Sequence, residues 1–142
     1  MKNTLFVLLV LLFSAASSGA QDSDYAQIER TLHYYLDGGT NNDFETLRKA
    51  FDESAVMRAG GEKPMEVNAL EFFESRMKPG PKSNRQTRIA YINVMGTAAN
   101  AQVVIDYEGF SFIDYMNLLK LDGEWKIVSK IFHRRVHPKP EQ

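Results

Sequence analysis

The sequence predicts an α+β domain in which three N-terminal helices pack on one face of a strongly curved antiparallel sheet. The length of 142 residues suits one domain, and hydrophobic and charged residues make up 44% and 25% of the chain, as in globular proteins. After residue 20, apolar residues first recur at helical spacing, and β-branched and aromatic residues then dominate to the C-terminus. Helices and strands separated in this way pack economically as two layers.

Charge and composition exclude several classes of function. The 17 Lys and Arg against 18 Asp and Glu give a net charge of -1, so no basic surplus favours a nucleic-acid partner. Cys is absent, which excludes disulfides, thiolate metal sites and a nucleophilic Cys. Neither a cofactor nor a metal site is predicted from any motif.

The first twenty residues have the pattern of a secretion signal. Lys2 precedes an unbroken apolar run over residues 5–13, and small residues then lead to Ala20. The run reaches only about half of the roughly 20 residues that span a bilayer. We therefore expect a signal peptide over 1–20, cleavage near Ala20, a single domain over 21–142 without a membrane span, and a periplasmic or secreted location. The alternative is an uncleaved anchor or a buried core helix.

The first two helices follow the predicted cleavage site. Acidic and serine residues at 22–24 supply N-caps for a helix with Tyr25, Ile28 and Leu32 on one face. Gly38 and Gly39 are expected to end it, because glycine adopts the left-handed C-cap conformation at low cost. Residues 41–43 then cap a second, short helix that places Phe44 and Leu47 inward.

A strand and a third helix come next. Residues 55–59 read as a short strand that ends at Gly60 and Gly61. Asn68, with Glu71 three residues later, resembles a capping box and predicts a helix that ends before Pro79. Four strands follow, over 88–96, 100–109, 110–121 and 124–135, and Asp122-Gly123 predicts a two-residue hairpin turn between the last two.

The last hairpin resembles a known family. The stretch FIDYMNLLKLDGEWKIVSKIFH over residues 112–133 is similar to the end of the putative lumazine-binding family, which belongs to the nuclear transport factor 2-like superfamily. The segments TLHYYLDGG (31–39) and LRKAF (47–51) are similar to its first two helices. The resemblance implies a cone-shaped fold with a pocket between helices and sheet, often dimeric. The superfamily includes ketosteroid isomerase, scytalone dehydratase and limonene epoxide hydrolase beside non-enzymatic members, so the resemblance implies no particular reaction.

Hairpin pairing predicts which side chains share a face. With a two-residue turn at Asp122-Gly123, residue i pairs with residue 245 − i, which places Asp114 and His133 on the apolar face of Trp125. A carboxylate and an imidazole inside the cone are a candidate catalytic acid/base pair. The alternative places Asp114 at a solvated strand end and His133 at the rim.

Other residues are candidates for ligand contact. Aromatic and apolar side chains are expected to line a pocket, although such residues also form ordinary cores. Two arginines are candidates for an anionic ligand at the cone's mouth, or are surface residues. The predicted ligand-binding set is Tyr35, Phe51, Arg58, Phe73, Arg88, Tyr91, Tyr107, Phe112, Met116 and Trp125.

The opposite face of the same hairpin suggests self-association. It carries an apolar set that a monomer would leave wet, namely Ile113, Leu119, Val128 and Phe132. We expect a homodimer through this face, or its cover by the chain's own termini.

Three hypotheses of function follow, in order of preference. The first is an exported protein that binds an unknown small molecule in an apolar, aromatic pocket. The second is an enzyme of isomerase, dehydratase or hydrolase type that uses Asp114 and His133. The third is a dimeric interaction module without a ligand.

Overall fold

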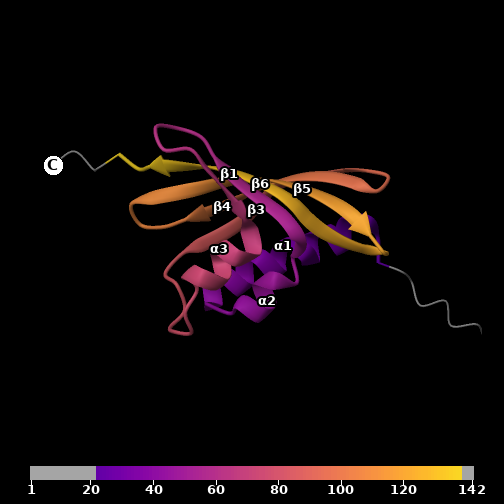
Figure 1. Ribbon diagram of the computed structural model, residues 1–142, viewed down its shortest axis with the longest axis horizontal. Helices are drawn as coiled ribbons and strands as arrows, with labels where there is room; N and C mark the ends of the chain where they lie inside the picture. The colour runs from indigo at the N-terminus through magenta and orange to yellow at the C-terminus, as the bar shows by residue number, and fades with distance from the viewer. Residues whose placement is uncertain (1–21, 139–142) are drawn as a thin grey trace, which may run out of the picture.

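The structure is a computed structural model that describes residues 22–138, so the predicted signal peptide lies outside the described residues. Three helices lie on one side of a strongly bent sheet (Figure 1). The elements, in chain order, are α1 (Asp24–Asn41), α2 (Phe44–Arg48), β1 (Phe51–Ala59), β2 (Met65–Asn68), α3 (Ala69–Arg76), β3 (Gln86–Met95), β4 (Ala98–Asp106), β5 (Phe110–Leu121) and β6 (Glu124–Val136).

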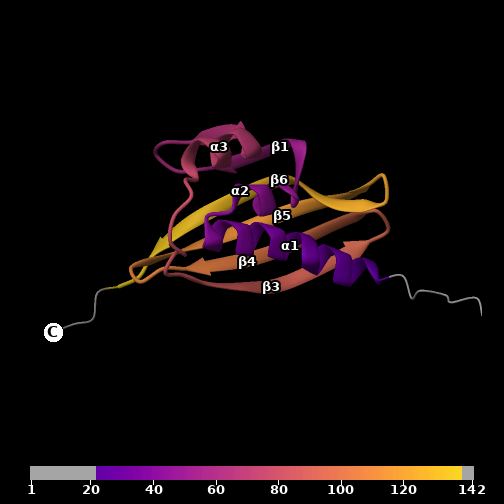
Figure 2. The same ribbon diagram turned by 90° about the horizontal axis from the view of Figure 1, so that it is seen from below.

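The sheet is mixed, where a purely antiparallel sheet was expected. Its strand order is β2-β1-β6-β5-β4-β3, and β1 runs parallel to β6 while every other neighbouring pair is antiparallel. The predicted four-strand meander from β3 to β6 is present, and β1 pairs in parallel with its last strand, β6; the chain between these two strands contains β2, α3 and β3 to β5. Figure 2 shows α1 lying across the sheet and α3 at the β1 end.

The helix starts agree with the sequence, but the end of α1 does not. Asp43 and Asn68 cap α2 and α3 as predicted, each side chain accepting a hydrogen bond three residues on. α1 runs past Gly38 to Asn41 and ends at Asn42, whose φ of 54° is left-handed. Gly38 instead permits close packing, because a Cβ there would lie 2.5 Å from the backbone nitrogen of Leu47.

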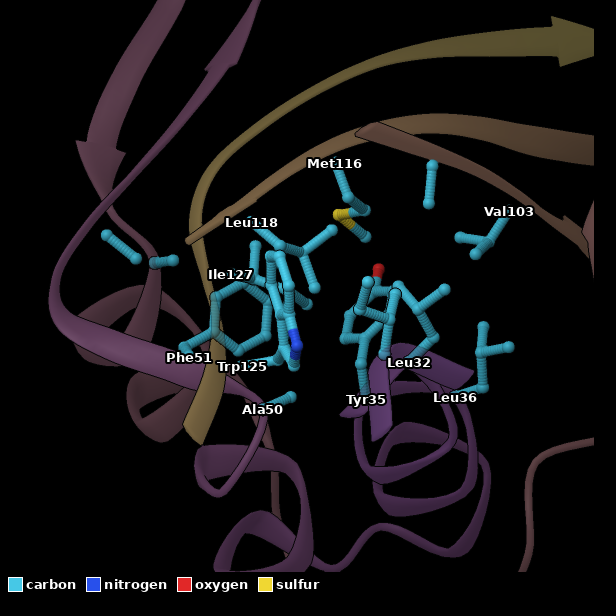
Figure 3. Packing of buried hydrophobic residues seen from close by; sticks show 14 of the residues in the cluster. Leu32, Tyr35, Leu36, Ala50, Phe51, Val103, Met116, Leu118, Trp125 and Ile127 are labelled. Atoms are coloured by element: carbon cyan, nitrogen blue, oxygen red, sulfur yellow. The ribbon is translucent and has the colours of Figure 1, made fainter. Parts of the chain in front are cut away.

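The core lies between α1 and the inner face of the sheet (Figure 3). Ile28, Leu32 and Leu36 form the buried stripe of α1, at the spacing of successive helical turns. They pack against inward side chains of the central strands, among them Met116 and Ile127. One continuous cluster therefore joins the helices to the sheet.

A β-bulge in the last hairpin decides which side chains of β6 face this core. The Asp122-Gly123 turn has positive φ at both residues, as a type I′ turn requires, and the predicted pairing holds from Leu121↔Glu124 to Leu118↔Ile127. The register then shifts by one, so that Asn117 pairs with Ser129 and Val128 is the extra residue. Beyond the bulge, every β6 side chain lies on the face opposite to the one predicted.

Candidate functional site

A buried polar cluster lies in the middle of the cone, with one member from each of α1, β5 and β6. Asp114 faces the interior, as predicted, and is 0% exposed. The Tyr35 hydroxyl donates a 2.7 Å hydrogen bond to its Oδ2, and the Lys130 ammonium lies 3.1 Å from its Oδ1. The bulge thus gives Asp114 a lysine partner where the sequence predicted His133.

Burial dominates the electrostatics of this cluster. Desolvation, followed by the negative charge of Asp114, raises the pKa of the Tyr35 hydroxyl well above 10.0. Desolvation also lowers the pKa of Lys130 from 10.5, and the attraction of Asp114 opposes that shift. Lys130 Nζ also lies 4.1 Å from the centre of the Phe132 ring. Water does not reach the carboxylate of this ion pair, because Asp114 is 0% exposed.

The predicted acid/base pair of Asp114 and His133 is wrong. His133 pairs with Ile113 and is exposed on the outer face, whereas Asp114 pairs with Phe132 and points inward. The physical reason is the bulge at Val128, which exchanges the two faces of β6.

Five of the predicted ligand contacts form packed protein interior. The rings of Tyr35, Phe51 and Phe73 contact one another, with centres 5.5 to 5.8 Å apart. Met116 and Trp125 are buried, and the indole Nε1 donates to Asp24 over 3.0 Å. The chain's own side chains therefore fill the region where an aromatic pocket was expected.

Two further predicted contacts lie near the end of the inner face. Phe112 and Tyr107 are half-buried and meet edge to face, with ring centres 6.3 Å apart. The Tyr107 hydroxyl accepts a 3.0 Å hydrogen bond from Arg85, which also donates to Thr40. Arg85 was missed from the sequence, since an arginine in a polar loop gives no local signal of this role.

Arg88 and Tyr91 lie on the outer face of β3, away from the buried cluster. Arg88 pairs with Val104 and is exposed, and Tyr91 donates a 2.9 Å hydrogen bond to Asn100. Six of the large exposed apolar residues gather on the outer face of β3 to β6: Tyr91, Met95, Tyr115, Leu119, Leu121 and Ile131. Phe132, predicted for this face, points inward, and Ile131 takes its place.

An open groove of about 620 Å³ lies between the β1–β2 hairpin and the end of β6. Its lining is mainly apolar and includes the charged or ionisable side chains of Arg58, Glu66 and His133. The lining residues are Arg58, Ala59, Gly60, Pro64, Met65, Glu66, Tyr115, Ile131, Phe132 and His133. A neighbouring cleft of about 500 Å³ adds Gly61 and Arg134.

Strand pairing explains why these residues meet. Glu66, Arg58, Ile131 and Tyr115 form one row across β2, β1, β6 and β5. Arg58 Nε donates to Glu66 over 2.7 Å. Of the predicted site residues, the structure brings Arg58 and His133 together here. Ile131, Tyr115 and Met65 were missed, because β2 was not predicted and the bulge reverses Ile131.

Residues 22–138 contain neither a metal-binding cluster nor a membrane-spanning helix. No group of three or more His, Asp or Glu side chains there is arranged to hold a metal ion. No helix in that range is long and apolar enough to cross a membrane.

Proteins of similar structure or sequence are known. An NTF2-like protein of unknown function from Shewanella baltica OS155 is 34% identical with a TM-score of 0.70, over 81% of this chain and 94% of that chain. One from Methylobacillus flagellatus KT is 31% identical with the same TM-score, over 84% and 97%. Aldolase FrzH from Cladobotryum sp. is 23% identical over 114 residues, 78% of this chain and 91% of that protein.

The family described as putative lumazine-binding matches residues 23–133, which include all three helices and the sheet almost to the end of β6. The fold and this match together confirm the resemblance seen in the last hairpin. The chain belongs to the putative lumazine-binding family and has the NTF2-like fold.

Proposed function

We propose that the protein binds a small molecule in the groove between the β1–β2 hairpin and β6. The observation that carries the proposal is the groove itself, whose volume of about 620 Å³ lies in the range of ligand sites, roughly 300–1,000 Å³. An apolar wall with a few convergent polar groups is the usual composition of such sites. The filled interior around Asp114 supports this position over the centre of the cone.

The exposed wall of the groove has an energetic reason to take a ligand. Ile131 is 50% exposed and Tyr115 38% exposed, so their apolar atoms contact water in the free protein. Covering the exposed half of an isoleucine side chain is worth about 1 kcal/mol. The family description also supports a small-molecule ligand.

Native mass spectrometry of the protein purified from its producing cells tests this proposal. We expect a retained small molecule on the wild type and its loss in Ile131→Trp, which fills the groove. Leu119→Trp is the matched control, because Leu119 is an exposed apolar residue on the same face but does not line the groove. A molecule that persists in Ile131→Trp, or a wild type that retains none, contradicts the proposal.

A second candidate function is self-association through the outer face of the sheet. The observation that favours it is the gathering of large exposed apolar residues on that face, of which Tyr91, Met95, Leu119 and Leu121 lie outside the groove. Exposed apolar side chains gathered on one face are typical of a protein–protein contact. We propose that the protein forms a homodimer through this face.

We also propose that the protein is exported after cleavage near Ala20, because residues 1–20 have the pattern of a secretion signal.

A further inference from the structure

The guanidinium of Arg58 bears on the chemical class of ligand that the groove would take; this inference rests on the proposed function. Arg58 and His133 line the groove beside its apolar wall, and Glu66 is the one acidic residue among the lining residues. Glu66 is already engaged by Arg58. Arg58 is the one Lys or Arg side chain among the lining residues, so its guanidinium is the group that would receive an anion.

Arg58 is positioned to receive that anion. Its guanidinium uses Nε for the 2.7 Å hydrogen bond to Glu66, and neither Nη group donates to another of the described residues. The end of the guanidinium that carries both Nη groups is therefore open. That end matches the two oxygens of a carboxylate, which accept parallel hydrogen bonds in a bidentate pair.

The apolar part of the groove continues from this guanidinium. Ile131 is the direct neighbour of Arg58 across the β1–β6 pairing, and Tyr115 lies beyond it on β5. A ligand whose carboxylate meets Arg58 would lay its apolar body over these two residues. The groove thus places one charged end beside a continuous apolar wall.

We propose that the groove binds a small amphipathic carboxylate, with its head group on Arg58 and its apolar body on Ile131 and Tyr115. The head group is held by the Nη groups of Arg58 that the hydrogen bond from Nε to Glu66 leaves free. Glu66 competes with the ligand for Arg58, so its carboxylate is expected to weaken binding of the ligand's carboxylate.

Octanoate and 1-octanol test the assignment, because they share a chain length and differ in charge. By isothermal titration calorimetry we expect the wild type to bind octanoate about tenfold more tightly than octanol. Arg58→Met should abolish that preference, and Glu66→Gln should strengthen octanoate binding. Arg88→Met is the matched control, because Arg88 is exposed on the same sheet face but does not line the groove.

The outcomes separate this inference from the proposed function. Equal binding of octanoate and octanol, or a preference that survives Arg58→Met, overturns the carboxylate assignment and leaves the groove as a binding site. Failure of both compounds to bind overturns the carboxylate assignment. Native mass spectrometry of the wild type and Ile131→Trp then tests independently whether the groove binds a small molecule.

Discussion

Removing the Lys130 side chain should destabilise the fold strongly, because it leaves the buried carboxylate of Asp114 without its positively charged partner. The side chains of Lys130 and Asp114 are 5% and 0% exposed, so the pair lies outside the reach of solvent screening. Breaking a buried ion pair from one side costs about 3–5 kcal/mol, since the remaining charge has lost its partner. We therefore expect Lys130→Met to lower the free energy of unfolding by about 3–5 kcal/mol.

A triple variant distinguishes the cost of the unpaired buried charge from the cost of lost side-chain packing. Tyr35→Phe, Asp114→Leu and Lys130→Met together leave neither a buried charge nor a hydroxyl without an acceptor. Replacing buried ion pairs by apolar residues is often neutral or stabilising, so the triple variant should regain most of the stability lost in Lys130→Met. Urea unfolding followed by the fluorescence of Trp125, the single tryptophan, measures each value.

Lys126→Met is the matched control in the same strand. Its ammonium lies 3.1 Å from Glu124, but the two side chains are 27% and 72% exposed. Exposed pairs contribute about 0–1 kcal/mol, so this change should have a small effect. A free energy of unfolding for Lys130→Met within about 1 kcal/mol of the wild type, or a triple variant no more stable than Lys130→Met, would contradict a stabilising buried ion pair.

Four further predictions follow from particular contacts. Because the pKa of Tyr35 is raised in the folded state, its contribution to stability is complete below pH 10.0 and is lost as pH rises toward the folded pKa. Tyr35→Phe should therefore lose less stability than the wild type at alkaline pH, as measured by urea unfolding at several pH values. The same dependence of unfolding free energy on pH in both proteins would contradict this. Gly38→Ala should lower the free energy of unfolding by about 1–3 kcal/mol, because the added methyl group would overlap Leu47. Gly60→Ala, which has open space around it, should be as stable as the wild type, and equal stability of the two variants would contradict this prediction. Leu119→Glu should convert a dimer to a soluble monomer in sedimentation velocity, and a wild type that is monomeric at high micromolar concentration refutes the dimer. The intact mass of the exported protein should match residues 21–142, and full-length chain in the membrane fraction refutes cleavage.

Local patterns predicted most of the elements because the relevant physics is local. The caps at Asp43 and Asn68 and the turn at Asp122-Gly123 depend on side chains within three residues, and all three are found where the sequence placed them. The end of α1 depends instead on a distant partner. Gly38 looks like a helix stop, but its small size serves the contact with Leu47 and the helix continues past it.

The candidate site was harder to predict because it depends on long-range pairing. The turn fixes the register only as far as Leu118↔Ile127, and no glycine marks the bulge at Val128 that follows. A shift of one residue exchanges the faces of β6, which brings Lys130 inside and carries His133 out. β2 was missed for a similar reason, since a four-residue strand gains its identity from pairing with β1.

We infer that the ligand binds in the groove on the outer side of β6 and not in the cone beside Asp114. A crystal structure of the protein with octanoate distinguishes the two positions. We expect electron density for octanoate along Ile131 and Tyr115, with carboxylate oxygens about 2.7–3.0 Å from the Nη atoms of Arg58. Octanoate bound inside the cone, against Tyr35 and Lys130, would contradict it.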